Sequence, residues 1–208
     1  ASVRAQTRPA DELLVVIDHN DALLDALSDL DAKVVPNAGP KGLSGGRNTG
    51  IELASGDVVA FLDDDATAEP AWLEHLAAPF ADEAVVAVGG WAVPNWDVAP
   101  PAWFPDEFAW VIGCSHRGLP TTTAPVRNVI GCNMAFRRQA MVDAGGFDAG
   151  LGRTADRPLG CEETELCIRI HQQDPSTVVL LEPRAVIHHR VPAARGRWRY
   201  FLSRCRAE

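Results

Sequence analysis

The fold class of this chain follows from one stretch, Val58-Val59-Ala60-Phe61-Leu62-Asp63-Asp64-Asp65. Its first five residues form a continuous apolar run, which is typical of a strand buried on both faces of a parallel sheet. Three aspartates close the run. Carboxylates at the carboxyl end of such a strand lie where open α/β sheets bind their ligands. The stretch therefore predicts an α/β sheet with a ligand site at this edge.

Segments on either side extend the same pattern. Apolar runs rich in β-branched residues predict further strands at residues 13–17, 33–35 and 84–88. Helically spaced leucines follow the first run, a glycine-rich loop at residues 39–48 leads into a helix near residues 49–54, and Pro70 opens another helix. This alternation predicts a Rossmann-like, mostly parallel sheet flanked by helices.

The second half of the chain is less regular. Residues 91–125 carry six prolines and four tryptophans, so we expect an irregular segment that flanks a pocket. The remaining patterns predict a strand at 126–136, a helix at 162–172, two strands at 178–181 and 185–189, and an amphipathic helix from Trp198 onward. A basic amphipathic helix either packs on its own domain or lies on an anionic membrane surface.

Length and composition describe an ordinary globular chain. The 208 residues are 47% hydrophobic and 23% charged, which suits a single domain. No apolar run approaches the ~20 residues of a membrane-spanning helix. Five cysteines without a CxxC pair argue against a disulfide framework and against a structural zinc site. A reducing cytoplasm is the simplest compartment for such a chain.

The net charge of −9 is unevenly distributed along the chain. Residues 184–208 contain seven arginines and one acid, which leaves −15 on the first 183 residues. An acidic body of this kind argues against nucleic-acid binding. It suits a site that holds a metal cation, although most of the acids are expected on the solvated surface.

Two groups of acids and a histidine pair are candidate metal or catalytic residues. The aspartates at 63–65 repel one another unless a cation is present, and oxygen ligands suit Mg²⁺ or Mn²⁺; the alternative is a solvated acidic turn. Glu162 and Glu163 open a helix, where acids either complement the helix dipole or supply a general base. His188 and His189 point to opposite faces of a strand, so at most one of them serves a given site, as a metal ligand or as a structural residue.

Asp18 and Arg47 are candidate nucleotide-binding residues. Asp18 ends the strand at 13–17, where a carboxylate accepts from a ribose hydroxyl or a base N–H, or caps a helix. Arg47 follows Gly45-Gly46 and offers planar donors to a phosphate near a helix start. The segment is neither a P-loop nor a GxGxxG motif.

Together these pieces resemble family 2 glycosyltransferases, which are inverting enzymes with the GT-A fold. The matching stretches occur in the order of the family and cover nearly the whole chain. They are LLVVID (13–18), GGRNTGIELASGDVVAFLDDD (45–65), GCNMAFRR (131–138), GGFD (145–148), CEETELCIRI (161–170) and PRAVIHH (183–189).

The resemblance implies roles on the donor side of the site. Asp18 would contact the nucleoside, and Arg47 would lie near the donor. The aspartates match the DxD motif, in which Asp65 is the metal ligand and Asp63 or Asp64 faces the ribose or the sugar. His189 fits the metal-side histidine of the family better than His188.

The resemblance also implies a catalytic pair, and a nearby strand is our own candidate for lining the donor sugar. The Glu-Asp pair of the family falls on Glu162 and Glu163, and its second acid is the catalytic base. Glu163 stands where the family has Asp, so the base has one extra methylene. Cys132 and Asn133 lie on a strand that would line the donor sugar.

These roles describe a metal-dependent inverting transferase with Mn²⁺ or Mg²⁺ as cofactor. It would move a sugar from a nucleotide-diphosphate sugar to the hydroxyl of a saccharide, lipid-linked or small-molecule acceptor. Residues 1–90 would form the nucleotide-binding part, 91–190 the acceptor and catalytic part, and 191–208 a basic tail. That tail suggests a cytoplasmic protein with a peripheral contact at the inner face of the membrane. The alternatives are a sugar nucleotidyltransferase and a non-catalytic carbohydrate-binding remnant.

One departure from the family lies at the ends of the chain. Residues 1–10 read as the tail of a helix, and no stop signal follows the terminal amphipathic segment. We therefore expect that the first strand of the fold is missing and that both ends are cut.

Overall fold

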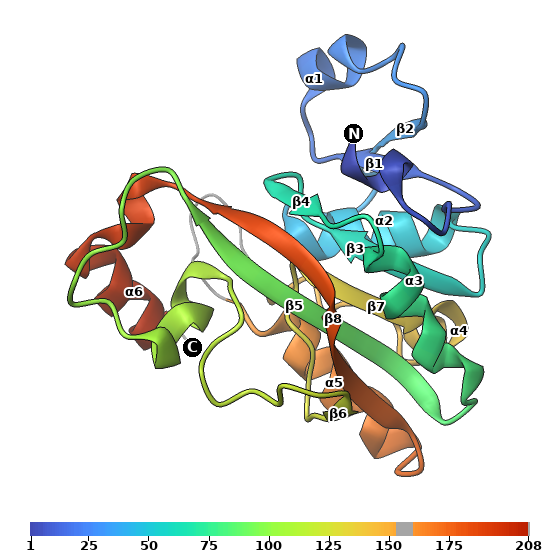
Figure 1. Ribbon diagram of the computed structural model, residues 1–208. Helices are drawn as coiled ribbons and strands as arrows, with labels where there is room; N and C mark the ends of the chain where they lie inside the picture. The colour runs from blue at the N-terminus through green and yellow to red at the C-terminus, as the bar shows by residue number, and fades with distance from the viewer. Residues whose placement is uncertain (153–159, 208) are drawn as a thin grey trace.

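The computed structural model describes residues 1–152 and 160–207. Its helices are η1 Ser2–Ala5, α1 Asp21–Ala26, α2 Leu43–Leu53, α3 Trp72–Ala77, η2 Ala78–Ala81, η3 Asp106–Ile112, α4 Arg138–Asp143, α5 Glu162–Gln173, η4 Ala193–Gly196 and α6 Trp198–Ala207. Its strands are β1 Leu14–Ile17, β2 Lys33–Pro36, β3 Val58–Leu62, β4 Ala66–Ala68, β5 Val85–Trp96, β6 Ala124–Pro125, β7 Asn133–Arg137 and β8 Val178–Val191. Figure 1 shows their arrangement.

Six strands form the central sheet, in the order β3-β7-β5-β8-β4, with β6 paired to β8. The predicted α/β sheet flanked by helices is confirmed, but its mostly parallel character is wrong. Only β5 and β8 pair in parallel in this sheet, whereas β7 is antiparallel to both β3 and β5. Because β7 lies between β3 and β5, those two strands still run in the same direction. A doubly buried strand has the same apolar pattern in either direction, so the sequence does not reveal this insertion.

The first two strands form a separate parallel pair, β1-β2. Helix α2 contacts both units, since Gly50 faces Val16 of β1 while Ile51 packs into the core of the large sheet. In Figure 1 this N-terminal unit lies at the top of the molecule. The expected absence of a preceding strand stays a prediction. Residues 1–10 contain one turn of 3-10 helix, at Ser2–Ala5, rather than the tail of a longer helix.

Helix α2 begins six residues earlier than predicted. It starts at Leu43, so Gly45 and Arg47 lie within the helix and not in a glycine-rich loop. A Cβ atom at Gly45 would come within 1.8 Å of the Pro40 carbonyl oxygen. The glycine is therefore required because the preceding loop folds back against the first turn of the helix.

Helices cover both faces of the central sheet. On one face, α2, α4 and α5 enclose a core of thirteen buried residues that includes Phe136, Met141 and Leu166. On the other face, Trp72 and Leu76 of α3 pack against a second buried cluster. The sheet is consequently held between two apolar layers, and its strand ends are left free to carry polar side chains.

The irregular second half is more ordered than predicted. Strand β5 continues to Trp96, and the two strands expected at 178–189 are one strand, β8. The strand expected at 126–136 is shorter than predicted, since β7 begins only at Asn133 and ends at Arg137.

The C-terminal helix packs on the aromatic segment. Phe201 of α6 is buried against Trp103, Phe104 and Phe108. Trp198 stacks on Phe201 but is 56% exposed. The amphipathic helix is therefore confirmed for residues 198–207, while Glu208 lies outside the described residues. Among the helices that the structure describes, none has the length and apolar character needed to cross a membrane.

Candidate active site

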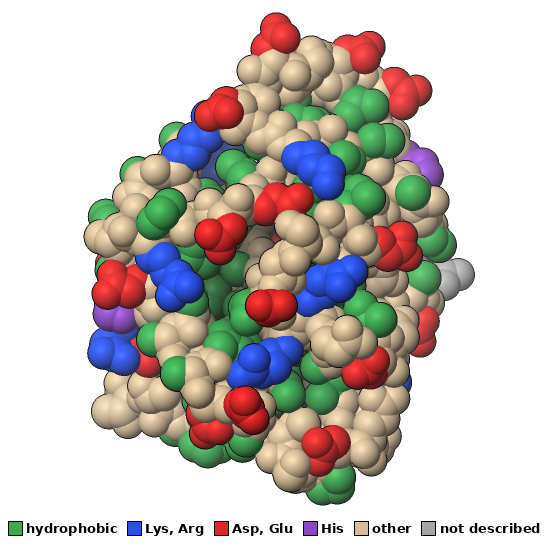
Figure 2. Space-filling model, turned by 90° about the vertical axis from the view of Figure 1, so that its right-hand side faces the viewer, with side chains coloured by type: hydrophobic (Ala, Val, Ile, Leu, Met, Phe, Trp, Pro, Cys, Tyr) green, Lys and Arg blue, Asp and Glu red, His purple; other side chains and the backbone are tan. Residues whose placement is uncertain are grey.

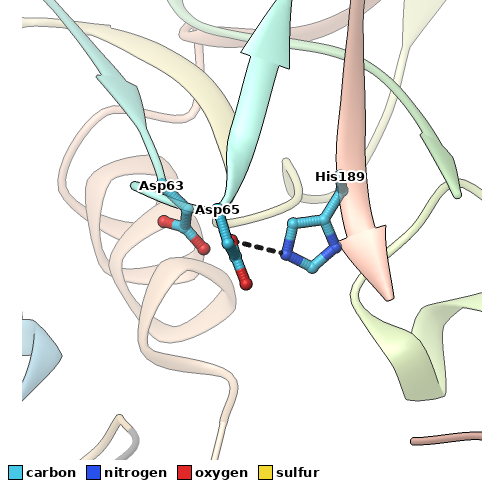
Figure 3. A group of neighbouring side chains, drawn as sticks. All are labelled: Asp63, Asp65 and His189. Atoms are coloured by element: carbon cyan, nitrogen blue, oxygen red, sulfur yellow. Dashed lines mark ion pairs between the residues drawn. The ribbon is translucent and has the colours of Figure 1, made fainter. Parts of the chain in front are cut away.

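Three side chains converge at one edge of the central sheet. Asp63 and Asp65 follow the end of β3, and β8 brings His189 opposite them (Figure 3). One potential ligand atom from each lies within 4.8 Å of the others. The Nε2 atom of His189 is 3.1 Å from Oδ1 of Asp65. The predicted metal ligands Asp65 and His189 are thus neighbours, and Asp63 joins them.

The charges of this group fit a divalent cation. Oδ1 of Asp65 is buried and has no well-aligned hydrogen-bond partner among the described residues. The imidazole of His189 holds the pKa of Asp65 below its ordinary value, whereas burial raises the pKa of Asp63. A cation between the three side chains would add a ligand contact to this buried oxygen and relieve the repulsion between two carboxylates. Two oxygens and an imidazole nitrogen are a suitable donor set for such an ion.

The neighbouring candidates Asp64 and His188 lie outside this group. Asp64 is exposed to solvent. His188 points to the other face of β8, where its Nε2 atom is 3.1 Å from Oε1 of Glu69. Of the two histidines, His189 lies beside the aspartates and His188 does not, and the role of His189 as a metal ligand stays a prediction. A contact of Asp64 with the ribose or the sugar stays a prediction.

The sequence did not single out two neighbours of the metal group, Gly113 and Arg195. Gly113 has φ +80°, and a Cβ atom there would lie 2.9 Å from Cε1 of the His189 ring, so the position must stay open. The Nη2 atom of Arg195 is 3.6 Å from Oδ2 of Asp65. Neither residue belongs to a motif, because the turn after η3 and the end of β8 meet only in three dimensions.

Arg47 is buried in the middle of the site. Its Nη1 atom is 2.6 Å from Oε1 of Glu162, and its Nη2 atom donates to the Gly131 carbonyl at 2.9 Å. The same Nη2 atom is 3.6 Å from Oδ1 of Asp63, and the guanidinium lies over the Phe147 ring. The planar fork of arginine therefore links the aspartates of β3 to the glutamates of α5. The predicted contact of Arg47 with the donor stays a prediction.

Glu162 and Glu163 have different environments in the first turn of α5. Glu162 is buried and paired with Arg47. Glu163 is partly exposed, and burial together with the nearby Glu162 charge raises its pKa to about 7. A carboxyl group with this pKa exchanges a proton near neutral pH, as a general base requires. The arrangement thus engages Glu162 with Arg47 and leaves Glu163 available to exchange a proton.

The residue before this pair, Cys161, has φ +71°, which is rare for a side chain other than glycine. Strained backbone of this kind occurs at functional sites because the surrounding structure enforces it. Here it turns the chain sharply into α5 and sets the direction of the first glutamates.

Asp18 organises the loop that follows β2. Its Oδ1 atom accepts from Nδ2 of Asn37 at 2.7 Å, and its Oδ2 atom accepts from the Gly42 backbone N–H at 3.0 Å. The helix-cap alternative is wrong, because Asn20 is the N-cap of α1 and accepts from the Leu23 N–H. The carboxylate of Asp18 remains exposed, and its contact with a nucleoside stays a prediction.

Asn133 does not line a sugar site. Its side chain is completely buried, and all its hydrogen bonds go to the sheet and to Trp72. That expectation is wrong because β7 is an inner strand of the sheet, so Asn133 faces the interior.

The comparisons with known proteins agree with this geometry. Residues 1–144 match the family model described as "Glycosyl transferase family 2". The chain belongs to this family. It is 40% identical over 193 residues to "Glucosyl-dolichyl phosphate glucuronosyltransferase" of Haloferax volcanii, covering 90% of this chain and 62% of that protein. It is 28% identical over 160 residues to "Pre-mycofactocin glycosyltransferase" of Mycobacterium tuberculosis, covering 76% of this chain and 32% of the relative.

Solved structures share the fold of this family 2 domain. "GalNAc-T7 with UDP, GalNAc and Mn2+" superposes with a TM-score of 0.65 at 21% identity, over 91% of this chain and 40% of that one. A mannosyltransferase of Pyrobaculum calidifontis, in complex with GDP-Man and Mn²⁺, gives a TM-score of 0.58 at 18% identity, over 90% and 50% of the two chains. The present chain therefore spans less than two thirds of each of these relatives.

The first prediction concerns the metal group. Replacing Asp65→Asn removes an anionic ligand, so we expect Mn²⁺ binding, measured by calorimetry without nucleotide, to weaken at least ~10-fold, since even outer-shell partners of metal sites contribute that much. The matched control is Asp64→Asn, which removes the same charge one residue away from the group and should keep the wild-type affinity. Equal affinities in the two variants would contradict the assignment.

Proposed function

We propose that this domain catalyses the metal-dependent, inverting transfer of a sugar from a nucleotide-diphosphate sugar to an acceptor hydroxyl. The observation that carries the proposal is the link through Arg47. This one guanidinium contacts Asp63, in the group suited to a cation, and Glu162, beside the carboxyl group with a pKa near 7. A site for the leaving diphosphate and a general base for the acceptor are thus parts of one charged network.

On the donor side, the residues of the chain bind and orient the nucleotide sugar. Asp63, Asp65 and His189 would hold the divalent cation, which when bound stabilises the negative charge of the leaving diphosphate. Asp18, with the loop it organises, would contact the nucleoside. Asp64 is the exposed carboxylate beside the metal group, and we assign it to the ribose or the sugar.

Mn²⁺ is the cofactor that we propose. An imidazole among the ligands favours Mn²⁺ over Mg²⁺, which prefers oxygen ligands and octahedral geometry. Both superposed neighbours were solved with Mn²⁺, one with UDP and the other with GDP-Man. These neighbours support a nucleotide-sugar donor for this chain but differ in the base they bind.

On the acceptor side, Glu163 takes the proton from the attacking hydroxyl. The hydroxyl oxygen attacks the anomeric carbon from the face opposite the diphosphate, so configuration inverts in one displacement. Because the pKa of Glu163 is about 7, the carboxylate is a stronger base than an ordinary glutamate and is still about half ionised at neutral pH. Its longer side chain fills the place of the aspartate expected from the family.

We assign the acceptor to the lipid-linked class, on the inner face of the cytoplasmic membrane. The name of the archaeal relative specifies a glucosyl-dolichyl phosphate substrate, which is a lipid-linked sugar. In the present chain, α6 exposes Arg199 and Arg206 around a hollow lined by Trp198 and Leu202. Exposed aromatic rings beside arginines are typical of surfaces that contact anionic headgroups.

The charge of the molecule is polarised in a way that suits this orientation. Figure 2 shows acidic side chains gathered at the top of the face it presents, over the N-terminal unit. Exposed aspartates in and after α1 lie in this unit, namely Asp21, Asp25, Asp29 and Asp31. Helix α6 lies far from this unit in Figure 1, so an anionic surface would attract one end of the molecule and repel the other.

The second prediction tests the base. Glu163→Gln keeps the size and polarity of the side chain but cannot accept the proton, so we expect nucleotide-sugar binding to persist while transfer slows at least ~100-fold. Glu165→Gln is the matched control, since Glu165 lies in the same turn and pairs with Arg169 on the helix surface. Release of nucleoside diphosphate in the presence of acceptor is the measurement.

Several outcomes of that experiment would contradict the proposal. Near wild-type turnover in Glu163→Gln would refute the base assignment. A wild-type protein that consumes or forms pyrophosphate with the sugar nucleotide, without releasing nucleoside diphosphate, would instead be a sugar nucleotidyltransferase. A folded wild-type protein that binds no nucleotide sugar would be a non-catalytic carbohydrate-binding domain.

The third prediction tests the membrane surface. We expect wild-type protein to bind vesicles that contain anionic lipid and not neutral vesicles, and Arg199→Ala/Arg206→Ala to lose ~2 kcal/mol of this binding, at about 1 kcal/mol per arginine. Arg117→Ala is the matched control, because Arg117 is an exposed arginine already neutralised by Asp106 and Glu107. Equal vesicle binding by the wild type and the double variant would contradict the proposed surface.

A further inference from the structure

Strand β8 contains an interruption in its pairing with β5. Gly90 of β5 pairs with Glu182, but the next residue, Trp91, pairs with Val186. Three residues of β8, at positions 183–185, therefore have no partner in β5, and we call these three residues the excursion of β8. Beyond this excursion the pairing continues regularly to the end of both strands, past His189.

The length of the excursion decides which residues of β8 face the metal group. Side chains alternate between the two faces of a strand, so an odd number of extra residues exchanges the faces. Before the excursion the even-numbered Leu180 packs with Val88, and after it the odd-numbered Ile187 packs in the same cluster. His189 shares the face of Ile187. An even excursion would place His188 there instead.

The side chain of Asn133 bonds to both strands at the end of the excursion, where the pairing resumes. Its Nδ2 atom donates to the carbonyl of Trp91 at 3.2 Å and to the carbonyl of Ala185 at 2.9 Å. These carbonyls border the interruption, one on each strand. The side chain has no exposed surface, so each bond replaces a ladder bond in a place that water does not reach.

Trp72 and Gly90 determine how the amide sits. The indole Nε1 of Trp72 donates to Oδ1 of Asn133 at 2.8 Å, and because an indole can only donate, the NH₂ group must face the two carbonyls. A Cβ atom at Gly90 would lie 2.2 Å from the Ala185 oxygen and 2.4 Å from Nδ2 of Asn133. The amide is thus fixed in orientation and packed without spare room.

We propose that Asn133 is the positioning residue for the metal ligand His189. By bonding to the carbonyls of Trp91 and Ala185, it keeps the excursion of β8 at three residues, and the odd count turns His189 rather than His188 toward Asp65. This inference rests on the proposed metal site. It gives Asn133, in the segment Gly131-Cys132-Asn133, a role that involves no contact with the donor.

The test is a double-mutant cycle on Mn²⁺ affinity, measured by calorimetry without nucleotide. Asn133→Leu keeps the branched shape and the number of heavy atoms of the side chain and removes its hydrogen bonds. We expect it to weaken Mn²⁺ binding at least ~10-fold, as loss of an outer-shell partner does. We also expect His189→Ala to weaken binding in the wild type but to have little further effect in the Asn133→Leu background, because His189 has already left the site. A purely structural role would give additive effects.

Matched variants separate positioning from loss of stability. Met134→Ala empties a buried position on the opposite face of β7 and should lower the melting temperature while leaving Mn²⁺ affinity unchanged. If Asn133→Leu does not fold, Trp72→Phe replaces it in the cycle, since it keeps an aromatic ring at this position and removes the donor that orients the amide. Additive effects with His189→Ala would overturn the inference. Failure of the wild type to bind Mn²⁺ would instead overturn the metal site itself.

Discussion

The buried ion pair between Arg47 and Glu162 is the interaction on which the rest of the site depends. It joins α2 to α5, which are 115 positions apart at these residues, and both side chains are almost fully enclosed. Breaking such a pair by removing one partner costs about 3–5 kcal/mol, because the other charge is left buried. The Nη2 atom of the same guanidinium donates to the Gly131 carbonyl and forms an ion pair with Asp63. One side chain therefore sets the distance between the two halves of the site.

This pair also distributes charge over the site. Burial raises the pKa of Glu163, and the charge of Glu162 beside Arg47 adds to that rise. At the other end, burial raises the pKa of Asp63 while Arg47 opposes that rise. The same cation thus stabilises one carboxylate near the metal group and one near the base. The chemistry proposed for the domain needs both, since a negative leaving group and a proton acceptor must function in one small volume.

The sequence predicted the parts of the fold that depend on local pattern. The apolar run before Asp63 and the acids at Glu162 and Glu163 were found at a strand end and at a helix start, as expected. The pairing of Arg47 with Glu162 could not be predicted, because it depends on how α2 and α5 pack across the sheet. A helix start at Leu43 was hidden by glycines that normally favour loops.

Nor could the sequence show the partners of the strands. Strand β7 enters between β3 and β5, and nothing in its apolar residues specifies an antiparallel neighbour. The sequence pattern of this region predicted two short strands, since Glu182, Pro183 and Arg184 interrupt the apolar run near the excursion of β8. Asn133 was expected near the sugar because the strand that contains it was expected to line the donor site. Its burial follows only from the three-dimensional pairing that it helps to hold.

The pH dependence of transfer, at saturating Mn²⁺, tests the central role of the Arg47–Glu162 pair most directly. The base must be ionised, so the wild-type rate should rise with pH through a pKa of about 7. In Glu162→Gln the like charge is gone and Arg47 is freed to act on Glu163, so the pKa falls and the rise moves to lower pH. Glu165→Gln, the surface control, should keep the wild-type profile. A rise at the same or a higher pH in folded Glu162→Gln would contradict the account.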